Sequence, residues 1–317
     1  LSRHTATAVN PARLPIRVLN WIENCQLSLD AAGREWRIDV LSGEIESRPR
    51  VPPPRALRER ASPRRQRSSR RGVSPDGRWS VFVRDHNLWL RDSETKAETA
   101  LTNDGRPEQY YEARFDWSPD GRWLIGWRTI PGDEHWVHLI ESAPRDQVEP
   151  KLHRYFYHKP GDKLPITKPC LFDWQTRQPI PIPDEQFPNP WNITEAHWTP
   201  DGSRFSFVYN ERGHQVLRLI EVDPAKASVR TLIDERSATF IDYAYKRHLH
   251  RLDETHEAIW MSERDGWNHL HLYDTETGAV KSQITHGEWV VRGVDRVDAE
   301  RRQIWFHAGG IDPAQDP

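Results

Sequence analysis

Two pairs of histidines stand at a spacing that could bind a metal ion. His248 and His250 alternate along the chain, as do His269 and His271. Alternate side chains of a β-strand point to the same face, so each pair could offer two imidazole nitrogens to one ion. No cysteine or carboxylate completes a recognisable ligand pattern beside either pair. We therefore expect ordinary strand-face histidines, with no metal site and no cofactor.

One serine lies in a string close to a hydrolase nucleophile motif. Gly-x-Ser-x-Gly places its serine on a strained strand-to-helix turn. The nearest string here is Gly72-Val-Ser74-Pro-Asp-Gly77, whose second glycine comes one place late. No phosphate-binding glycine loop is found either. Acidic pairs such as Asp133-Glu134 fall in expected turns, where carboxylates are solvated. The sequence therefore offers no catalytic residue.

Ser74 belongs instead to a short phrase that occurs three times, as 74–77, 118–121 and 199–202. Each copy reads Ser/Thr-Pro-Asp-Gly and precedes a run of aromatic and β-branched residues. Proline presets φ, aspartate bonds to its own backbone and glycine accepts positive φ, so each copy predicts a tight turn before a strand. The aspartates are 44 and then 81 residues apart. This spacing indicates a repeat of about 40 residues with one degenerate copy.

The repeat predicts an all-β fold, a β-propeller with antiparallel four-stranded blades. Hairpin signals at 210–214 and 263–267 support it, whereas 143–190 is expected to be a long irregular stretch. A two-sheet sandwich is the rival, although it would need strands without the repeated phrase. We count about five to six blades and expect the propeller to be incomplete at the C-terminus. Open sheet edges template pairing with other chains, so we expect self-association or low stability.

The chain divides at a basic segment into an N-terminal part, 1–72, and the propeller, 73–317. The N-terminal part carries weak strand signals, a divergent β segment that ends in a proline- and arginine-rich loop. Eight arginines lie between Arg55 and Arg71. Such a run is either a nucleic-acid patch or a solvated linker. No aromatic residues interleave for base stacking, which favours the linker.

Overall composition and charge limit the classes of partner that we expect. The chain has 317 residues and a net charge of -2, so no global field favours nucleic acid or a membrane. No apolar run reaches about 18 residues, and no signal peptide is visible. The sequence leaves open whether the protein is cytoplasmic, periplasmic or secreted. The two cysteines, Cys25 and Cys170, are expected to be free.

Several longer phrases carry a resemblance to a known family. They are Ser262-Glu-Arg-Asp-Gly-Trp-Asn-His-Leu-His-Leu-Tyr-Asp274, 284–294, 81–92, and 151–155 followed by Lys159-Pro-Gly-Asp162. Together these resemble the N-terminal propeller region of the dipeptidyl peptidase IV family, in the prolyl oligopeptidase clan of serine peptidases. The similarity covers 73–317 in the same order, with 151–162 looking like an inter-blade crossing.

The resemblance implies an eight-bladed propeller that caps an α/β-hydrolase domain. In the family that domain carries the catalytic Ser, Asp and His, and it is absent from this chain. The implied role is non-catalytic: the propeller gates access and orients peptide substrates of a serine exopeptidase. The implied partners are peptides, the downstream hydrolase domain and a second copy in a homodimer. The alternative is a stand-alone propeller that binds a protein partner.

The resemblance also implies where a substrate would be held. In the family, two adjacent glutamates in a short helical insertion before a Trp-Ser-Pro-x-Gly turn bind the free amino terminus. The matching stretch, 105–117, is shorter and has no Glu-Glu pair. Glu112 is the closest match and Glu108 the next acidic candidate. Glu112 is thus either an amine anchor or a solvated, structural carboxylate, and release of dipeptides stays an open question.

Overall fold

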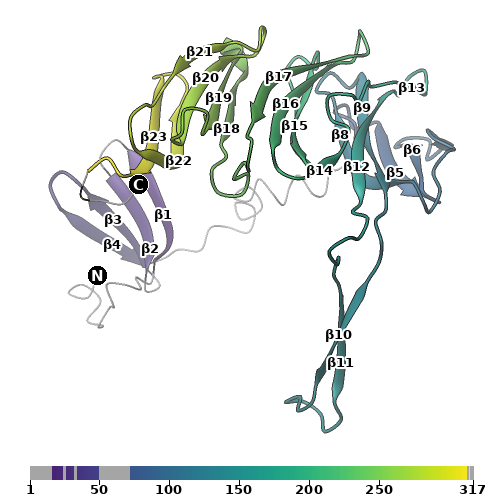
Figure 1. The fold of residues 1–317 in the computed structure, drawn as a ribbon, viewed down its shortest axis with the longest axis horizontal. Helices are drawn as coiled ribbons and strands as arrows, with labels where there is room; N and C mark the ends of the chain where they lie inside the picture. The colour runs from purple at the N-terminus through teal and green to yellow at the C-terminus, as the bar shows by residue number, and fades with distance from the viewer. Residues whose placement is uncertain (1–15, 24–25, 32–33, 50–71, 313, 315–317) are drawn as a thin grey trace. The chain divides into compact units, whose positions relative to one another are not determined.

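The computed structural model describes residues 16–23, 26–31, 34–49, 72–312 and 314. The chain forms two units, Leu1–Ser69 and Arg70–Pro317, each of which is described by itself (Figure 1). The described residues contain no α-helix and only one 3-10 turn, Asp253–Thr255, so none of their helices could span a membrane. Cys25 and the arginine run of 55–71 lie outside the described residues.

The N-terminal unit contains one four-stranded antiparallel sheet. Its strands follow chain order and are β1 (Ile16–Glu23), β2 (Gln26–Ala31), β3 (Arg34–Asp39) and β4 (Ile45–Pro49). Leu29 and Trp36 form its small described core. The sheet therefore has the strand count and meander order of a propeller blade.

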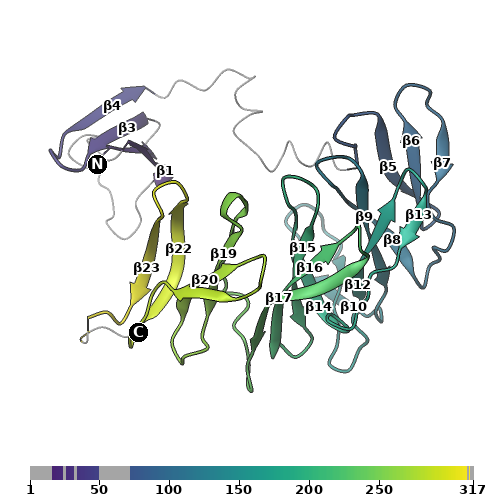
Figure 2. The ribbon, with the colours of Figure 1, turned by 90° about the horizontal axis from the view of Figure 1, so that it is seen from above.

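The second unit is a series of antiparallel sheets, which confirms the predicted all-β propeller architecture (Figure 2). Three strands form the first sheet: β5 (Trp79–Arg84), β6 (Asn87–Asp92) and β7 (Glu98–Ala100). The second sheet has four: β8 (Tyr110–Trp117), β9 (Trp123–Ile130), β12 (Ile166–Asp173) and β13 (Gln178–Ile180). The third has β14 (Pro190–Trp198), β15 (Phe205–Glu211), β16 (Val216–Asp223) and β17 (Ser228–Arg236).

Two further sheets follow along the chain. The fourth has β18 (Leu249–Leu252), β19 (Glu257–Ser262), β20 (His269–Asp274) and β21 (Val280–Gln283), and the fifth has β22 (Val290–Asp298) and β23 (Gln303–Gly309). Apolar clusters fill the spaces between consecutive sheets; one of them packs Trp127 of β9 against Phe205 and Phe207 of β15. Burial between neighbouring blades thus holds the series together.

The three repeated turns have the geometry that the sequence predicts. In the second copy, the Gly121 amide donates to the Ser118 carbonyl at 2.9 Å, and the Trp123 amide donates to Ser118 Oγ at 2.8 Å. Asp120 accepts the Arg122 amide at 3.1 Å. The other two copies repeat these contacts, and the three glycines have φ of 71 to 75°. The second and third copies join the first strand of a blade to the second, and the first copy shortly precedes β5.

A second repeated turn was not recognised in the sequence. In five of the sheets, an aspartate at the end of the next-to-last described strand accepts the amides two and three residues later, as Asp223 does from Ala225 and Lys226 at 3.1 Å each. The same contacts are made by Asp39, Asp92, Asp173 and Asp274. Because Asp39 belongs to the N-terminal sheet, that sheet is built like the others.

The expectation of an irregular stretch over 143–190 is wrong. This stretch contains β11 (Lys151–Phe156) and then β12 and β13, which complete the second blade. With β10 (Trp136–Glu141), β11 forms a two-stranded hairpin inserted between β9 and β12, and Figure 1 shows it projecting from that blade. We call residues 131–165 the arm. Residues 151–162 therefore lie within a blade insertion and are not an inter-blade crossing.

Candidate functional site

Glu112 lies in β8, the first strand of the second blade, where two threonines hold its carboxylate. The Thr129 hydroxyl of β9 donates to Glu112 Oε1 at 2.5 Å. The Thr167 hydroxyl of β12 lies 2.7 Å from that of Thr129 and 3.3 Å from Glu112 Oε1. Among the described residues, no donor lies within hydrogen-bond distance of Oε2. One oxygen of Glu112 is therefore fixed and the other is available.

Strand register brings these three side chains together. Thr129 pairs with Tyr110 on β8 and with Thr167 on β12, so the two hydroxyls lie on one face of the sheet. The register of β8 against β9 shifts between Tyr111 and Phe115. A bulge of this kind re-aims the side chains within it. Glu112 is the first residue of the shifted segment, and its side chain is half-buried beside the threonines.

Glu112 differs from two buried glutamates of the third blade, because none of the described cationic side chains forms an ion pair with it. Glu221 pairs with Arg230 at 2.7 Å, and Glu235 pairs with Arg264 at 2.9 Å. In the described part of the chain, the only hydrogen-bond donors to the Glu112 carboxylate are hydroxyl groups. Hydroxyls orient a carboxylate, but they do not neutralise it.

Glu108 has a different environment. It occupies the tip of a tight hairpin, in which Arg106 and Gln109 exchange backbone hydrogen bonds of 3.0 and 2.9 Å, and its side chain is exposed. The hairpin runs directly into β8, so the segment 105–117 contains no helical insertion. The structure therefore offers Glu112 and Glu108 as separate carboxylates and not as an adjacent pair.

Glu195 is a comparable residue that the sequence did not single out. It lies on β14, the first strand of the next blade, where the register also shifts, and it has a left-handed φ of 54°. Its Oε1 lies 3.3 Å from Arg247, and its carbonyl accepts from Arg251 at 2.8 Å. Both glutamates shortly precede a Trp-Ser/Thr-Pro-Asp-Gly phrase, which was the available signal. Of the two, Glu195 has cationic partners.

The sequence of this chain is similar to those of known proteins. The chain matches the family described as Dipeptidyl peptidase IV (DPP IV) N-terminal region over residues 51–316. It belongs to that family. The "Probable dipeptidyl peptidase 4" of Aspergillus flavus is 22% identical over 268 residues, which cover 74% of this chain and 33% of that protein. The "Probable dipeptidyl-aminopeptidase B" of Aspergillus oryzae is 24% identical over 291 residues, 76% of this chain and 32% of that protein.

A solved structure agrees at the level of the fold. The crystal structure of Porphyromonas gingivalis dipeptidyl peptidase 4 gives a TM-score of 0.55 at 18% identity. The match covers 94% of this chain and 41% of that one. This DPP IV N-terminal region spans about a third of the length of the curated relatives that it matches.

The opposite face of β8 and β9 borders a cavity of about 650 Å³ in this DPP IV N-terminal region. Tyr111 donates to Asp104 at 3.2 Å, and Arg128 pairs with Asp104 at 2.9 Å. Cys170 lines the same cavity and is free, and burial raises the pKa of its thiol to about 11. The thiol is thus neutral at physiological pH and a poor nucleophile.

Three of the alternating histidines, His250, His269 and His271, lie in strands as expected, whereas His248 directly precedes β18. The rings of His248 and His250 are parallel and 6.4 Å apart, and burial lowers the pKa of both. His269 is buried between the Thr285 hydroxyl at 3.1 Å and the Gly287 carbonyl at 2.9 Å. Within the described ranges, no group of three or more metal-ligating side chains is found.

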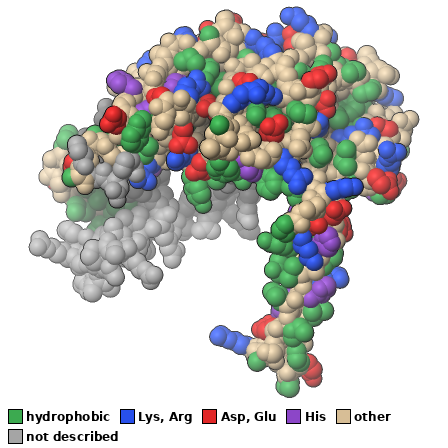
Figure 3. Space-filling view, in the orientation of Figure 1, with side chains coloured by type: hydrophobic (Ala, Val, Ile, Leu, Met, Phe, Trp, Pro, Cys, Tyr) green, Lys and Arg blue, Asp and Glu red, His purple; other side chains and the backbone are tan. Residues whose placement is uncertain are grey.

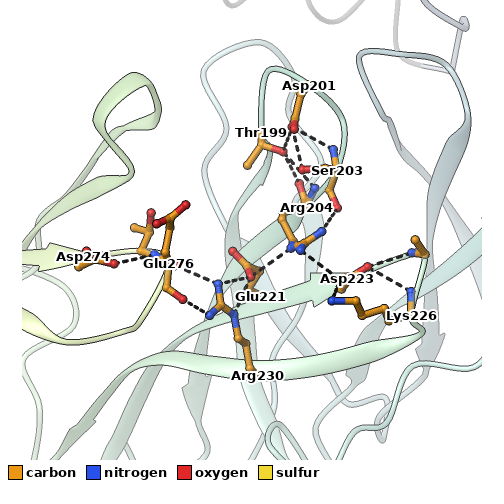
Figure 4. A network of polar contacts seen from close by, with 12 residues as sticks. Thr199, Asp201, Ser203, Arg204, Glu221, Asp223, Lys226, Arg230, Asp274 and Glu276 are labelled. Carbon is orange, nitrogen blue, oxygen red and sulfur yellow. Dashed lines mark hydrogen bonds and ion pairs between the residues drawn. The ribbon is translucent and has the colours of Figure 1, made fainter.

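A network of charges joins the third and fourth blades (Figure 4). Arg204 pairs with Asp223 at 3.1 Å, and Arg230 binds Glu221 at 2.7 Å while also donating to the Thr275 carbonyl at 3.0 Å. These residues line a cavity of about 780 Å³. Because these two carboxylates already have cationic partners, the network stabilises the blade contact, and Glu112 remains the stronger candidate for a ligand.

Proposed function

We propose that this chain is the non-catalytic propeller of a serine exopeptidase, which gates access and orients peptide substrates for an α/β-hydrolase domain. Family membership and relatives named as dipeptidyl peptidases support this role. The hydrolase domain would follow this chain in a longer protein. A downstream Gly-x-Ser-x-Gly domain in the natural reading frame supports the proposal, whereas its absence favours a stand-alone propeller that binds a protein partner.

The observation that carries the orienting role is the uncompensated carboxylate of Glu112. A half-buried carboxylate whose described donors are neutral keeps its negative charge, so a ligand of opposite charge can bind it. The protonated amino terminus of a peptide would do so through a charge-assisted hydrogen bond to Oε2. Glu112 thus serves as the amine anchor, and Glu108, exposed on its hairpin, is a secondary acidic candidate.

The test compares substrates that differ only at the amino terminus. In the longer protein, Glu112→Gln should raise KM about tenfold for a short Xaa-Pro peptide with a free amine, because one charge-assisted bond is lost. The acetylated peptide should be unaffected. Glu195→Gln is the matched control, since Glu195 already pairs with Arg247, and Glu108→Gln measures the secondary candidate. An unchanged KM in Glu112→Gln excludes Glu112 as the anchor.

We further propose that the arm is the contact surface of a homodimer. On one face of its hairpin, Trp136 lies opposite Phe156 and Ile140 lies opposite Leu152. These side chains are 47, 39, 72 and 64% exposed, respectively, and Figure 3 shows hydrophobic side chains along the arm. A two-stranded hairpin is marginally stable in water by itself. A second copy, related by a two-fold axis, would cover this face.

A further inference from the structure

We propose that Thr129 and Thr167 are positioning residues, which fix Glu112 so that Oε2 faces the ligand amine. The root of the arm, where its two legs 131–135 and 157–165 leave the blade, helps to hold the two threonines in place. This inference rests on the proposed role of Glu112 as the amine anchor. Hydroxyls, unlike an arginine, hold the carboxylate without competing with the ligand ammonium.

Neutral donors leave the charge of Glu112 available. An arginine beside Glu112 would compete with the ligand ammonium, as Arg247 would at Glu195. The Thr129 hydroxyl, at 2.5 Å, restricts the rotation of the carboxylate without neutralising it. A carboxylate that is already oriented loses less conformational entropy when the ligand binds. The threonine pair therefore raises affinity for a protonated amine at Oε2.

The arm root adds contacts just beyond the β9–β12 ladder that pairs Thr129 with Thr167. Thr129 and Thr167 are each one residue from the point where β9 and β12 become the two legs of the arm. The Asp133 amide donates to the Lys163 carbonyl at 2.9 Å, and the Lys163 amide donates to Asp133 Oδ2 at 2.9 Å. A Cβ at Gly132 would meet the Lys163 carbonyl oxygen at 2.2 Å, so this approach of the legs requires glycine.

A third contact ties the legs farther out. His135 Nδ1 lies 2.8 Å from Asp162 Oδ2, and the Tyr157 amide donates to the His135 carbonyl at 3.0 Å. Contacts at Asp133 and His135 of one leg thus join it to the other leg between the blade and the hairpin. Separating them at Gly132 would pull apart the strand ends that carry Thr129 and Thr167.

The hydroxyls are tested by paired substitutions in the longer protein. Thr129→Val and Thr167→Val keep a β-branched shape but remove the donor, whereas Thr129→Ser and Thr167→Ser keep the donor. We expect each valine variant to raise KM about fivefold for the free-amine peptide, with kcat and the acetylated peptide unchanged. The serine variants should stay within about twofold of the parent. Equal effects of valine and serine, or equal effects on both peptides, would overturn the proposal.

The root is tested separately by Gly132→Ala, which leaves the three polar side chains intact. It should also raise KM for the free-amine peptide selectively. Val148→Ser, at the exposed end of the arm, is the control. If Gly132→Ala leaves KM unchanged, the root does not support the site. If Glu112→Gln raises KM but the valine variants do not, this inference fails and the proposed function stands; if Glu112→Gln has no effect, the proposed function itself fails.

Discussion

The carboxylates of Glu257 and Glu112 are held in two different ways. Opposite charges bind Glu257, whereas neutral hydroxyls orient Glu112. The side chain of Glu257 is 4% exposed and contacts Arg302, Lys281 at 2.6 Å and the Thr255 hydroxyl at 2.8 Å. Arg302 and then Lys281 lower the pKa of Glu257 to about 2, although burial opposes this shift. Glu257 therefore contributes stability only while it is ionised.

We expect Glu257→Gln to lower the free energy of unfolding by about 1–2 kcal/mol at neutral pH, an estimate reduced for the half-exposed partners. The folded pKa lies below the ordinary value of 4.5. The contribution is thus complete above about pH 4.5 and is lost as pH falls toward about 2. The free energy of unfolding, measured with urea at several pH values between 3 and 7, should depend less steeply on pH in the variant than in the parent. Glu254→Gln, at an exposed neighbour, should change stability by less than about 0.5 kcal/mol.

The candidate site could be found only in part from the sequence. Glu112 was identifiable because it precedes the second Trp-Ser-Pro-Asp-Gly phrase. Thr129 and Thr167 lie 17 and 55 residues from it, and nothing in their local sequence marks them. Strand register alone places their hydroxyls beside the carboxylate. That no described cationic side chain pairs with Glu112 is likewise a property of packing that no motif encodes.

Among the elements, the repeated turns allow a matched comparison of two glycines. Gly77 and Gly202 have nearly equal φ, 75 and 73°. A Cβ on Gly77 would meet nothing within 4 Å, whereas a Cβ on Gly202 would lie 2.7 Å from Asp120 Oδ1 in the preceding turn. Conformational strain is therefore common to both positions, and the steric contact is specific to Gly202.

Gly77→Ala should destabilise the chain by about 1 kcal/mol through strain alone. Gly202→Ala should cost about 2–3 kcal/mol, because Asp120 must move as well. Thermal unfolding followed by circular dichroism measures the difference. Equal losses in the two variants would show that the contact between neighbouring turns contributes nothing to stability.

The elements also show why one part of the fold escaped prediction. The arm, 131–165, interrupts the second blade and breaks the repeat. Pro169 and Pro179 then make the strands that follow look irregular. Pro169 lies in β12 opposite Trp127, but β13 pairs only with Leu171, Phe172 and Asp173. The missing amide of Pro169 therefore falls where β12 has no second partner strand, so the proline is tolerated.

For the molecule as a whole, the arm predicts a concentration-dependent dimer. Ile140→Asp together with Leu152→Asp places two charges on its exposed apolar face. Sedimentation velocity should show the parent as a dimer and the double variant as a monomer, because burying unpaired carboxylates is unfavourable. Glu141→Gln, on the other face of the hairpin, is the control. A dimer that persists in the double variant would place the contact elsewhere.

The most direct test asks whether this propeller itself recognises a peptide amine at Glu112. Threonine methyl groups can be labelled with carbon-13 and the chain titrated with a short Xaa-Pro peptide. The free-amine peptide should shift the Thr129 and Thr167 methyl signals, since both threonines contact Glu112. The acetylated peptide should not, and Glu112→Gln should abolish the response. Equal shifts with both peptides, or no shift with either, would contradict the proposal that Glu112 anchors the substrate.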